Sequence, residues 1–575
     1  MGINLVKRFY SSRVFSLLCC FVWLSCLLKT DSYLAVYLLV GVFSVYSLTL
    51  DLNYSKKTCF FASLLSILVS ISNINSFHDS GQFFFVGILF ILNLLSGFFV
   101  FLRVVSFLDS LSISLKRRNL DNRKVSFFLF FVMFVFYGLV LLFFSRPGIL
   151  SNDSVDEVLQ VVSGNYSNHH PVFYTWTIGL FVNACTKFGL SLSSGILAFS
   201  LFQILLMSLV VAYSCFVMLK AFVPFKVVIC SFVFALFMPY NIAYSFTVWK
   251  DVFFAIVCLL FFSSSYDFLV IRKGKTRMLP LILLSIATVG ICLFRSNGFI
   301  GLGLSSFACL IMVLCLKRYY SYAVVLIAGL LVGFLLKGPF LDSLNIKSSD
   351  TVESLSIPMQ QISRIVVFHS SELTDEEVTS IEKVVSIDLI KESYDPHIHD
   401  PIKGAVRFYG DMTQIKDHKI EYLKLYISLC SKYPADCFYA WVNQTKGFYN
   451  SGYDNNKVYF GVVENEVGLD VTANEENRNI VWKYYSLFEK LPFLNPFLAM
   501  GLYVWLLLYC LYRSVSRKNA VNCLILITFC SIWGTYLIAT PVFNEFRYIY
   551  YIILCSPFFM CLSFLEAKDI SRGKR

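Results

Sequence analysis

Charged side chains are scarce in this sequence. Only 15% of its 575 residues are Asp, Glu, Lys or Arg, whereas 57% are hydrophobic and the mean hydropathy is +0.69. This composition excludes a soluble globular protein, which would need far more polar surface at that length. Separated apolar runs of about 20 residues predict instead an all-α polytopic membrane protein.

Motifs of several common protein classes are missing as well. The sequence has no glycine-rich phosphate-binding loop and no dinucleotide-binding fingerprint. Its 18 cysteines include no pair at metal-ligand spacing, and most of them lie within apolar runs. Two of them, Cys430 and Cys437, lie in a polar segment and could form a disulfide or remain two buried thiols. The sequence therefore indicates neither a bound nucleotide nor a cysteine metal site.

The apolar runs predict fourteen membrane-spanning helices. No small-residue cleavage site follows the first run, so it is interpreted as a retained span rather than a removed signal peptide. The predicted spans lie near residues 14–28, 33–50, 58–75, 83–108, 126–144, 194–219, 227–240, 250–270, 279–294, 297–316, 320–337, 492–514, 519–540 and 546–565.

Basic residues predict how these spans are oriented. Eight basic clusters fall on one side of the bundle, provided that the apolar segment 172–190 does not cross. Because Lys and Arg concentrate in cytoplasmic loops, both termini are expected in the cytoplasm, and 172–190 is interpreted as a re-entrant or interfacial helix of a multi-pass cell-membrane protein. The clusters are Lys7/Arg8/Arg13, Lys56/Lys57, Lys116–Lys124, Lys220/Lys226, Arg272–Arg277, Lys317/Arg318, Arg513–Lys518 and Arg572–Arg575.

One long polar segment, 342–490, is expected on the opposite, external side. It carries 23 acidic and 15 basic residues, a net charge of −8. Because the whole chain has a net charge of +12, the rest of the chain carries +20. The positive charge is thus an orientation signal and does not indicate a nucleic-acid partner. We divide the chain into an N-terminal four-helix extension (1–125), a membrane core (126–341) with an external loop (145–171), the external segment (342–490) and a three-helix C-terminal part (491–575).

The external segment is expected to be a small, mainly helical domain. Thr374 with Glu377 three positions later predicts a capping box at a helix start, and residues 457–463 could form a strand. The stretch "YDPHIHDP" holds two histidines, His397 and His399, between aspartates. These could bind a metal, but without a third ligand at fixed spacing an ordinary polar turn explains them as well.

A short external loop concentrates polar residues directly after an apolar run. The loop, "RPGILSNDSVDEVLQVVSGNYSNHHPV", contains Asp153, Asp156 and Glu157 near its start and His169 and His170 near its end. Carboxylates are costly near hydrocarbon and often mark a substrate or ion path. The plainer readings are that loops contain charges, that Asp153 caps a helix, and that the histidines only precede the next helix.

Three further external sites carry charge beside a predicted span. Lys250 and Asp251 begin one span, Arg295 and Asn297 occupy a hairpin, and Glu545 and Arg547 precede the last span, in "VWKD", "RSNG" and "NEFRY". A snorkelling lysine and an Asn-Gly turn are ordinary alternatives. However, two external arginines break the charge rule, and an arginine can bind phosphate bidentately.

Together these residues fit sugar transfer from a lipid phosphate. Asp153 is predicted to be the general base for an acceptor hydroxyl, and Asp156, three positions on, shares its helix face, whereas Glu157 points elsewhere. The remaining nine candidates are predicted to bind substrate, with cations stabilising the phosphate leaving group. They are Glu157, His169, His170, Lys250, Asp251, Arg295, Asn297, Glu545 and Arg547. A divalent cation is possible but not required, since a lipid monophosphate carries little charge.

The same loop resembles the first external loop of bacterial membrane proteins with the GT-C glycosyltransferase fold. In one branch the pattern is Pro-Gly-x-x-Ser-x-Asp-Ser-x-Asp-Gln, then Gly, then Asn-x-His-Pro; here Glu157 replaces the Gln. The likeness covers roughly 130–560 and excludes the first four spans. It implies a GT-C-like fold, Asp153 as the catalytic residue, a polyprenyl-phosphate-linked sugar donor, and a cell-envelope glycan, lipid or protein as acceptor.

Three other functions remain open from the sequence. A transporter or flippase for lipid-linked glycans would place charges along its spans, often in inverted repeats, whereas these spans are nearly free of charge. A glycan polymerase of another membrane fold would use similar external arginines and carboxylates. A non-catalytic sensor would have no need of Asp153 together with Arg295 and Arg547.

Overall fold

The fold comes from a computed structural model, which describes residues 10, 12–28, 34–50, 52–74, 83–113, 121–271, 274–347, 355–450, 460–471 and 479–565. Of the described residues 80% are helical, and they form no strand, only four isolated backbone bridges. The predicted all-α class is thereby confirmed. Several predicted features lie outside the described residues. They are the basic residues at 7–8, 116–118, 272–273 and 572–575 and part of the possible strand at 457–463.

Seven helices of the described chain are long and apolar enough to cross a membrane, or eight if the bent pair α11 (Phe225–Phe237) and α12 (Pro239–Ser245) is one span. The seven contain α6 (Phe83–Ser110), α7 (Asn122–Phe144), α10 (Leu192–Lys220), α13 (Lys250–Tyr266), α15 (Ser296–Leu316), α16 (Tyr320–Leu335) and α28 (Tyr550–Ser563). A membrane protein is therefore supported, while a count of fourteen crossings goes further than helix length and composition show.

Shorter helices occupy the other predicted spans. Apolar helices of 10 to 17 residues occur at five of them. The five are α2 (Arg13–Leu27), α3 (Leu34–Tyr46), α14 (Met278–Phe294), α26 (Met500–Ser516) and α27 (Ala520–Tyr536). Helix α4 (Lys56–Ser72) occupies the remaining predicted span.

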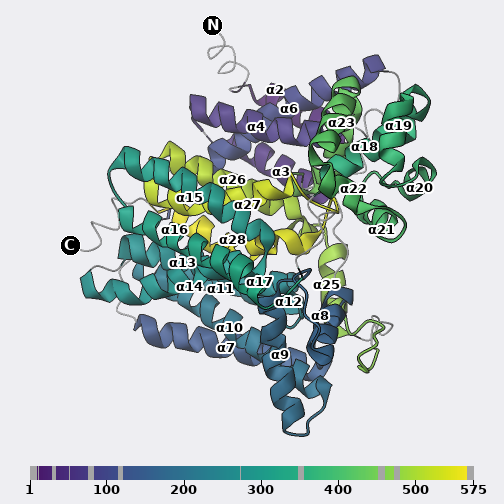
Figure 1. Cartoon of the computed structure of the whole chain (residues 1–575). Helices are drawn as coiled ribbons and strands as arrows, with labels where there is room; N and C mark the ends of the chain where they lie inside the picture. Colours follow the sequence, from purple (N-terminus) through teal and green to yellow (C-terminus); the bar gives the residue numbers. More distant parts are fainter. Residues whose placement is uncertain are drawn as a thin grey trace.

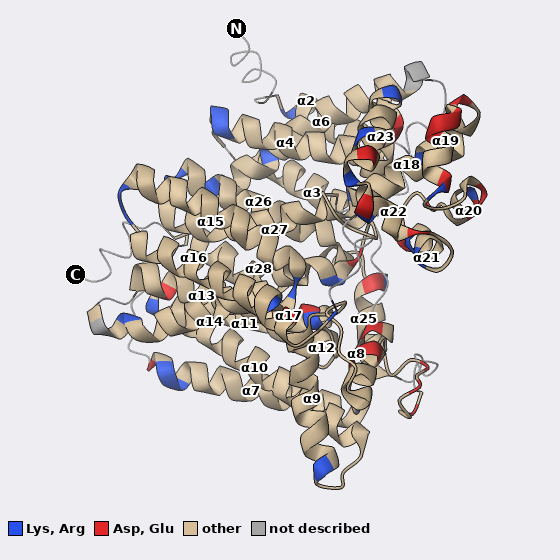
Figure 2. Ribbon diagram, in the orientation of Figure 1, with Lys and Arg blue, Asp and Glu red and all other residues tan. Residues whose placement is uncertain are grey.

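The long apolar helices run side by side and form one bundle (Figure 1). Charge is distributed unevenly along it: Lys and Arg gather at the ends of the helices nearest the C terminus, and Asp and Glu gather at the opposite end (Figure 2). We call that acidic end the α8 end, after helix α8 (Asn152–Ser163), which lies there. This arrangement is what the distribution of basic clusters in the sequence predicts for a membrane bundle.

The N-terminal helices are attached to the rest of the chain at both ends of the bundle. At one end Tyr512 donates a hydrogen bond to Asp109 (2.8 Å), whose carboxylate also lies 3.7 Å from the buried guanidinium of Arg513. At the other end Asn450 donates to the Ser72 hydroxyl (2.6 Å) and accepts from Tyr37. Buried polar pairs of this kind fix how helices dock, so the extension is an integral part of the bundle.

A helical region at the α8 end has a core of its own. Its helices surround buried residues that include Ile365, Val406 and Leu429, and the predicted capping box of Thr374 and Glu377 is present. The helices are α18 (Ser356–His369), α19 (Asp375–Glu382), α20 (Ile387–Ser393), α21 (Asp400–Tyr409), α22 (Met412–Asp417), α23 (Lys419–Lys432) and α24 (Pro434–Thr445), and α25 (Ile480–Lys490) leads back toward the bundle.

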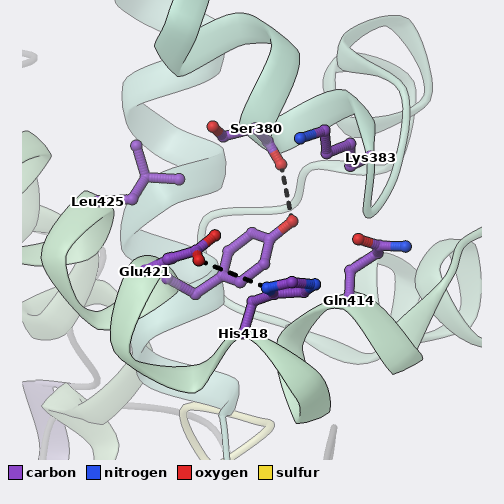
Figure 3. A pocket seen from close by; sticks show the side chains of 7 residues that line it. Ser380, Lys383, Gln414, His418, Glu421 and Leu425 are labelled. Atoms are coloured by element: carbon purple, nitrogen blue, oxygen red, sulfur yellow. Dashed lines mark hydrogen bonds and ion pairs between the residues drawn. The ribbon is translucent and has the colours of Figure 1, made fainter.

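Two sequence alternatives in this region are resolved. Cys430 and Cys437 are free thiols rather than a disulfide. Of the possible strand at 457–463, the described part forms only one bridge, between Val462 and Leu150. A polar pocket between α19, α22 and α23 contains none of the predicted site residues; in it Tyr422 donates to the Ser380 carbonyl (3.1 Å) and His418 lies 3.5 Å from Glu421 (Figure 3).

Segment 172–190 forms α9 (Val172–Lys187), which packs against α8 and α10. At 16 residues it is not among the helices of the described chain that are long and apolar enough to span. Its length fits the prediction that this segment does not cross, and that prediction stays to be tested by labelling.

Candidate functional site

Backbone pairing on both sides fixes the start of α8. The Ile149 amide donates to the Phe246 carbonyl (3.0 Å), and the Leu150 amide donates to the Gly461 carbonyl (2.9 Å). Ser151 is then the N-cap, in a capping box with Ser154, and Asp153 falls in the first turn. Because Ser151 does the capping, the Asp153 side chain is left to face its neighbours from other segments.

Asp153 is the centre of a charged cluster. Its carboxylate accepts a hydrogen bond from Arg547 (2.5 Å) and lies 3.9 Å from the Lys250 ammonium. Burial alone would raise the pKa of Asp153, but the charges of Arg547 and Lys250 outweigh it and hold that pKa well below its ordinary value. Asp153 is therefore ionised at any physiological pH.

The two histidines meet this cluster from the far end of the loop. The Lys250 ammonium lies 2.5 Å from Nδ1 of His170, and because an ammonium only donates, Nδ1 must accept. Burial, with a further contribution from Lys250, lowers the pKa of His170 to about 2. The His169 ring contacts that of His170 with centroids 4.7 Å apart. His170 is thus a neutral acceptor that holds Lys250 in place.

The other two carboxylates of α8 have unlike surroundings. Asp156 is exposed and has no ion pair with another described residue, and partial burial together with the charge of Asp153 raises its pKa. Glu157 is 1% exposed, and its Oε2 has no hydrogen-bond partner. Burial raises the pKa of Glu157 well above its ordinary value, so this side chain is a neutral acid beneath the cluster. It could touch a substrate only after its neighbours moved.

A second buried ion pair lies beside the first. Arg295 donates to Asp251, the residue after Lys250, and both side chains are buried. Tyr548 contacts both arginines: its ring centre is 4.6 Å from the guanidinium carbon of Arg295 and 5.4 Å from that of Arg547. Such cation–π contacts hold the two guanidinium groups on a common aromatic surface.

The remaining predicted residues complete the cluster. The Glu545 carboxylate lies 3.5 Å from Nε of Arg547. Asn297, two positions after Arg295, donates to the Thr535 hydroxyl (2.9 Å). The eleven predicted site residues thus come from four distant segments and meet at the α8 end of the bundle. Each arginine that was predicted to bind an anion is already neutralised by a carboxylate.

The loop that carries Glu545 and Arg547 is held by the helical region at the α8 end. The His399 amide donates to the Pro541 carbonyl (2.7 Å), and Ile398 and Val542 form an antiparallel backbone bridge. On its other side the loop lies against Gly447, where a Cβ atom would be 2.1 Å from the Phe543 carbonyl oxygen. The "YDPHIHDP" turn is therefore a support for the site loop.

Sequence reasoning missed two aromatic members of the site. Trp249 donates to the Ser151 hydroxyl (2.5 Å), and its ring centre is 5.3 Å from the Arg547 guanidinium carbon; Tyr548 is the platform described above. Both stand next to predicted residues, in "VWKD" and "NEFRY", and that adjacency was the available signal. No group of three or more His, Cys, Asp or Glu side chains that could hold a metal occurs in the described part of the chain.

Comparison with known proteins gives a family but no activity. Residues 162–574 match the model of a family of unknown function, DUF6020. The chain belongs to that family. No curated protein and no solved structure matches it. The matched region contains His169, His170 and the three later site segments, whereas the carboxylates of α8 and the N-terminal helices precede it.

Proposed function

We propose that this chain is an integral membrane glycosyltransferase of the GT-C type. In this proposal the α8 end faces outward, both termini are cytoplasmic, and a sugar passes from a polyprenyl-phosphate donor to a hydroxyl of a cell-envelope glycan, lipid or protein. The observation that carries the proposal is the meeting of carboxylates, cations and the neutral His170 from four segments around Asp153, at one end of an apolar bundle.

The two catalytic candidates, Asp153 and Asp156, have environments that divide the work between them. A general base works best when its pKa lies near the working pH. The raised pKa and exposed position of Asp156 favour it as the group that takes the acceptor proton. Asp153, ionised and bound to Arg547, then holds the cations in place and adds negative charge where an oxocarbenium-like centre would develop.

The cations have the complementary role in this proposal. Arg295 and Arg547 would stabilise the charge on the leaving lipid phosphate, and each can do so only while shared with its carboxylate partner. Sharing keeps the guanidinium groups in fixed orientations, so little reorganisation is needed during reaction. Lys250, fixed by His170, adds a third positive charge. A divalent cation is not required by this charge balance.

The test is sugar transfer in membranes that contain the full chain. Consumption of a radiolabelled polyprenyl-phosphate sugar is compared between the wild type, Asp153→Asn, Asp156→Asn and, as a matched control, Asp375→Asn in the external helical region. Loss of a positioned base costs about two to four orders of magnitude in rate. Asp375→Asn should transfer at the wild-type rate.

The outcomes separate the roles. A large loss in Asp156→Asn, with a loss in Asp153→Asn as well, supports the division of labour; a loss in Asp153→Asn alone returns the base to Asp153. If neither substitution affects transfer, the carboxylates are structural and the assignment of the catalytic site to α8 fails. No donor consumption by the wild type across polyprenyl-phosphate sugars would contradict the glycosyltransferase proposal itself.

A further inference from the structure

Lys337 occupies an unusual place at the α8 end. It lies in a π-helical turn, Leu336–Phe340, that ends the apolar helix α16, and π-helical turns inside helices are frequent at functional positions. Its ammonium lies 3.4 Å from the hydroxyl of Ser296, the residue that follows Arg295. That hydroxyl is the only hydrogen-bond partner of Lys337 among the described residues.

Lys337 differs in this respect from the other cations nearby. Arg295 is paired with Asp251, and Lys250 and Arg547 both lie against Asp153. Lys337 alone among these four cations has no carboxylate within ion-pair distance in the described chain. A positive charge placed at the edge of hydrocarbon without a partner is costly, and such charges usually mark a functional contact.

The surface around Lys337 is apolar on the side away from the cluster. The last turns of α16 expose Leu331, Phe334 and Leu335, and α15, which packs against α16, exposes Ile300 and Leu304. In a bilayer this face would contact acyl or prenyl chains. Lys337 therefore lies where an apolar surface meets the charged cluster.

The same turn also contacts α9, the helix that directly follows the two histidines. The Phe340 ring lies 6.4 Å, centre to centre, from Phe173 and from Trp176 in the first turns of α9, just after His170. The π-helical turn, the start of α15 and the start of α9 therefore border one another. A ligand at Lys337 would have the Arg295 pair on one side and the histidine loop on the other.

We propose that Lys337 and the Ser296 hydroxyl bind the phosphate of a membrane lipid whose tail lies along the exposed faces of α15 and α16. The phosphate would enter sideways from the bilayer, neutralise the unpaired ammonium and stand beside Arg295. Naming that lipid a polyprenyl monophosphate rests on the proposed function; the binding itself requires no sugar transfer. The competing explanation is a lysine that merely extends toward water from a helix end.

Binding to the purified full chain in detergent tests the proposal. The probe is a polyprenyl monophosphate, titrated while the thermal unfolding midpoint is recorded. A ligand that binds only the native state raises that midpoint by an amount that grows with the logarithm of one plus the ratio of ligand concentration to Kd. Two further arms use a polyprenol of the same length and inorganic phosphate. The variants are Lys337→Gln, Lys337→Arg and the control Lys317→Gln, at the opposite end of α15.

Loss of one charge-assisted contact corresponds to about a tenfold or greater rise in Kd. We expect that rise in Lys337→Gln, near wild-type binding in Lys337→Arg and Lys317→Gln, and no stabilisation by polyprenol. Unchanged binding by Lys337→Gln would show a snorkelling lysine and overturn the proposal. Equal stabilisation by polyprenol, or by inorganic phosphate at the same concentration, would overturn it as well, by showing recognition of the tail alone or of free phosphate.

The two proposals fail in different ways. Lys337-dependent binding without any sugar transfer would contradict the glycosyltransferase proposal and leave the lipid-phosphate site standing. Sugar transfer that persists while Lys337→Gln binds the probe normally would contradict the site and leave the transferase standing. The unliganded unfolding midpoint of each variant shows whether it is folded.

Discussion

The contact between Arg547 and Asp153 is the interaction on which the arrangement of the site most depends. The two residues are 394 positions apart and their charged atoms are 2.5 Å apart. Replacing either one leaves the other as a partly buried charge without its partner, whereas replacing both removes both charges. A double-mutant cycle of Asp153→Asn and Arg547→Gln therefore measures the pair directly, whatever reaction the protein catalyses.

The structure sets the size of the expected coupling. At an effective dielectric of about 20, two unit charges at this distance attract by about 6 kcal/mol before desolvation is counted. The side chains are 19% and 32% exposed, so solvent weakens the attraction and desolvation offsets part of the rest. We expect a coupling of about 1–3 kcal/mol. The double variant should therefore lose that much less unfolding free energy than the sum of the losses in the two single variants.

Reaction of buried thiols with a fluorogenic maleimide during heating supplies the assay. Most cysteines of the described chain are buried, so they react only as the protein unfolds. The control cycle uses Lys432→Gln and Glu377→Gln, a pair 3.7 Å apart near the surface, for which coupling should stay below about 1 kcal/mol. Additive midpoint shifts in the Asp153 and Arg547 cycle would show that the two charges do not meet in the folded protein.

Three further predictions concern pH, backbone packing and topology. Burial and a neighbouring ammonium lower the pKa of His170 to about 2, so on acidification this histidine takes up a proton in the unfolded chain before it does in the folded one. The free energy of unfolding should therefore fall as pH drops below about 6.5, by up to roughly 1.4 kcal/mol per pH unit. A His170→Asn variant melted from pH 7 to 5 should lose this contribution to the pH dependence. Gly447→Ala should lower the unfolding midpoint and sugar transfer, since its Cβ would press on the facing loop, whereas Gly303→Ala, with open space around it, should do neither. An impermeant thiol reagent applied to intact cells should label Glu421→Cys and spare Arg318→Cys, in a background without the exposed cysteines; the reverse pattern would invert the proposed orientation.

Local sequence determined much of the architecture. Apolar runs formed helices because a helix satisfies its own backbone hydrogen bonds, whatever its neighbours are. Thr374 and Glu377 formed the expected capping box because every partner lies within four residues. The unequal distribution of Lys and Arg between loops likewise appears as charge at opposite ends of the bundle (Figure 2). These features depend on neighbours along the chain, so the sequence alone carries them.

Which residues share the site could also be anticipated, because all of them lie in loops on one predicted side of the membrane. Their partners could not. Only the packing of α8, α13 and the 541–548 loop decides that Arg547 pairs with Asp153 and leaves Asp156 without an ion pair among the described residues. Pairing of this kind depends on ångström-scale distances between residues hundreds of positions apart, and no local pattern encodes them. For the same reason the sequence marked Lys337 only as the end of a span. Tertiary structure alone showed that, of the four cations at the α8 end, Lys337 is the one with no carboxylate partner in the described part of the chain.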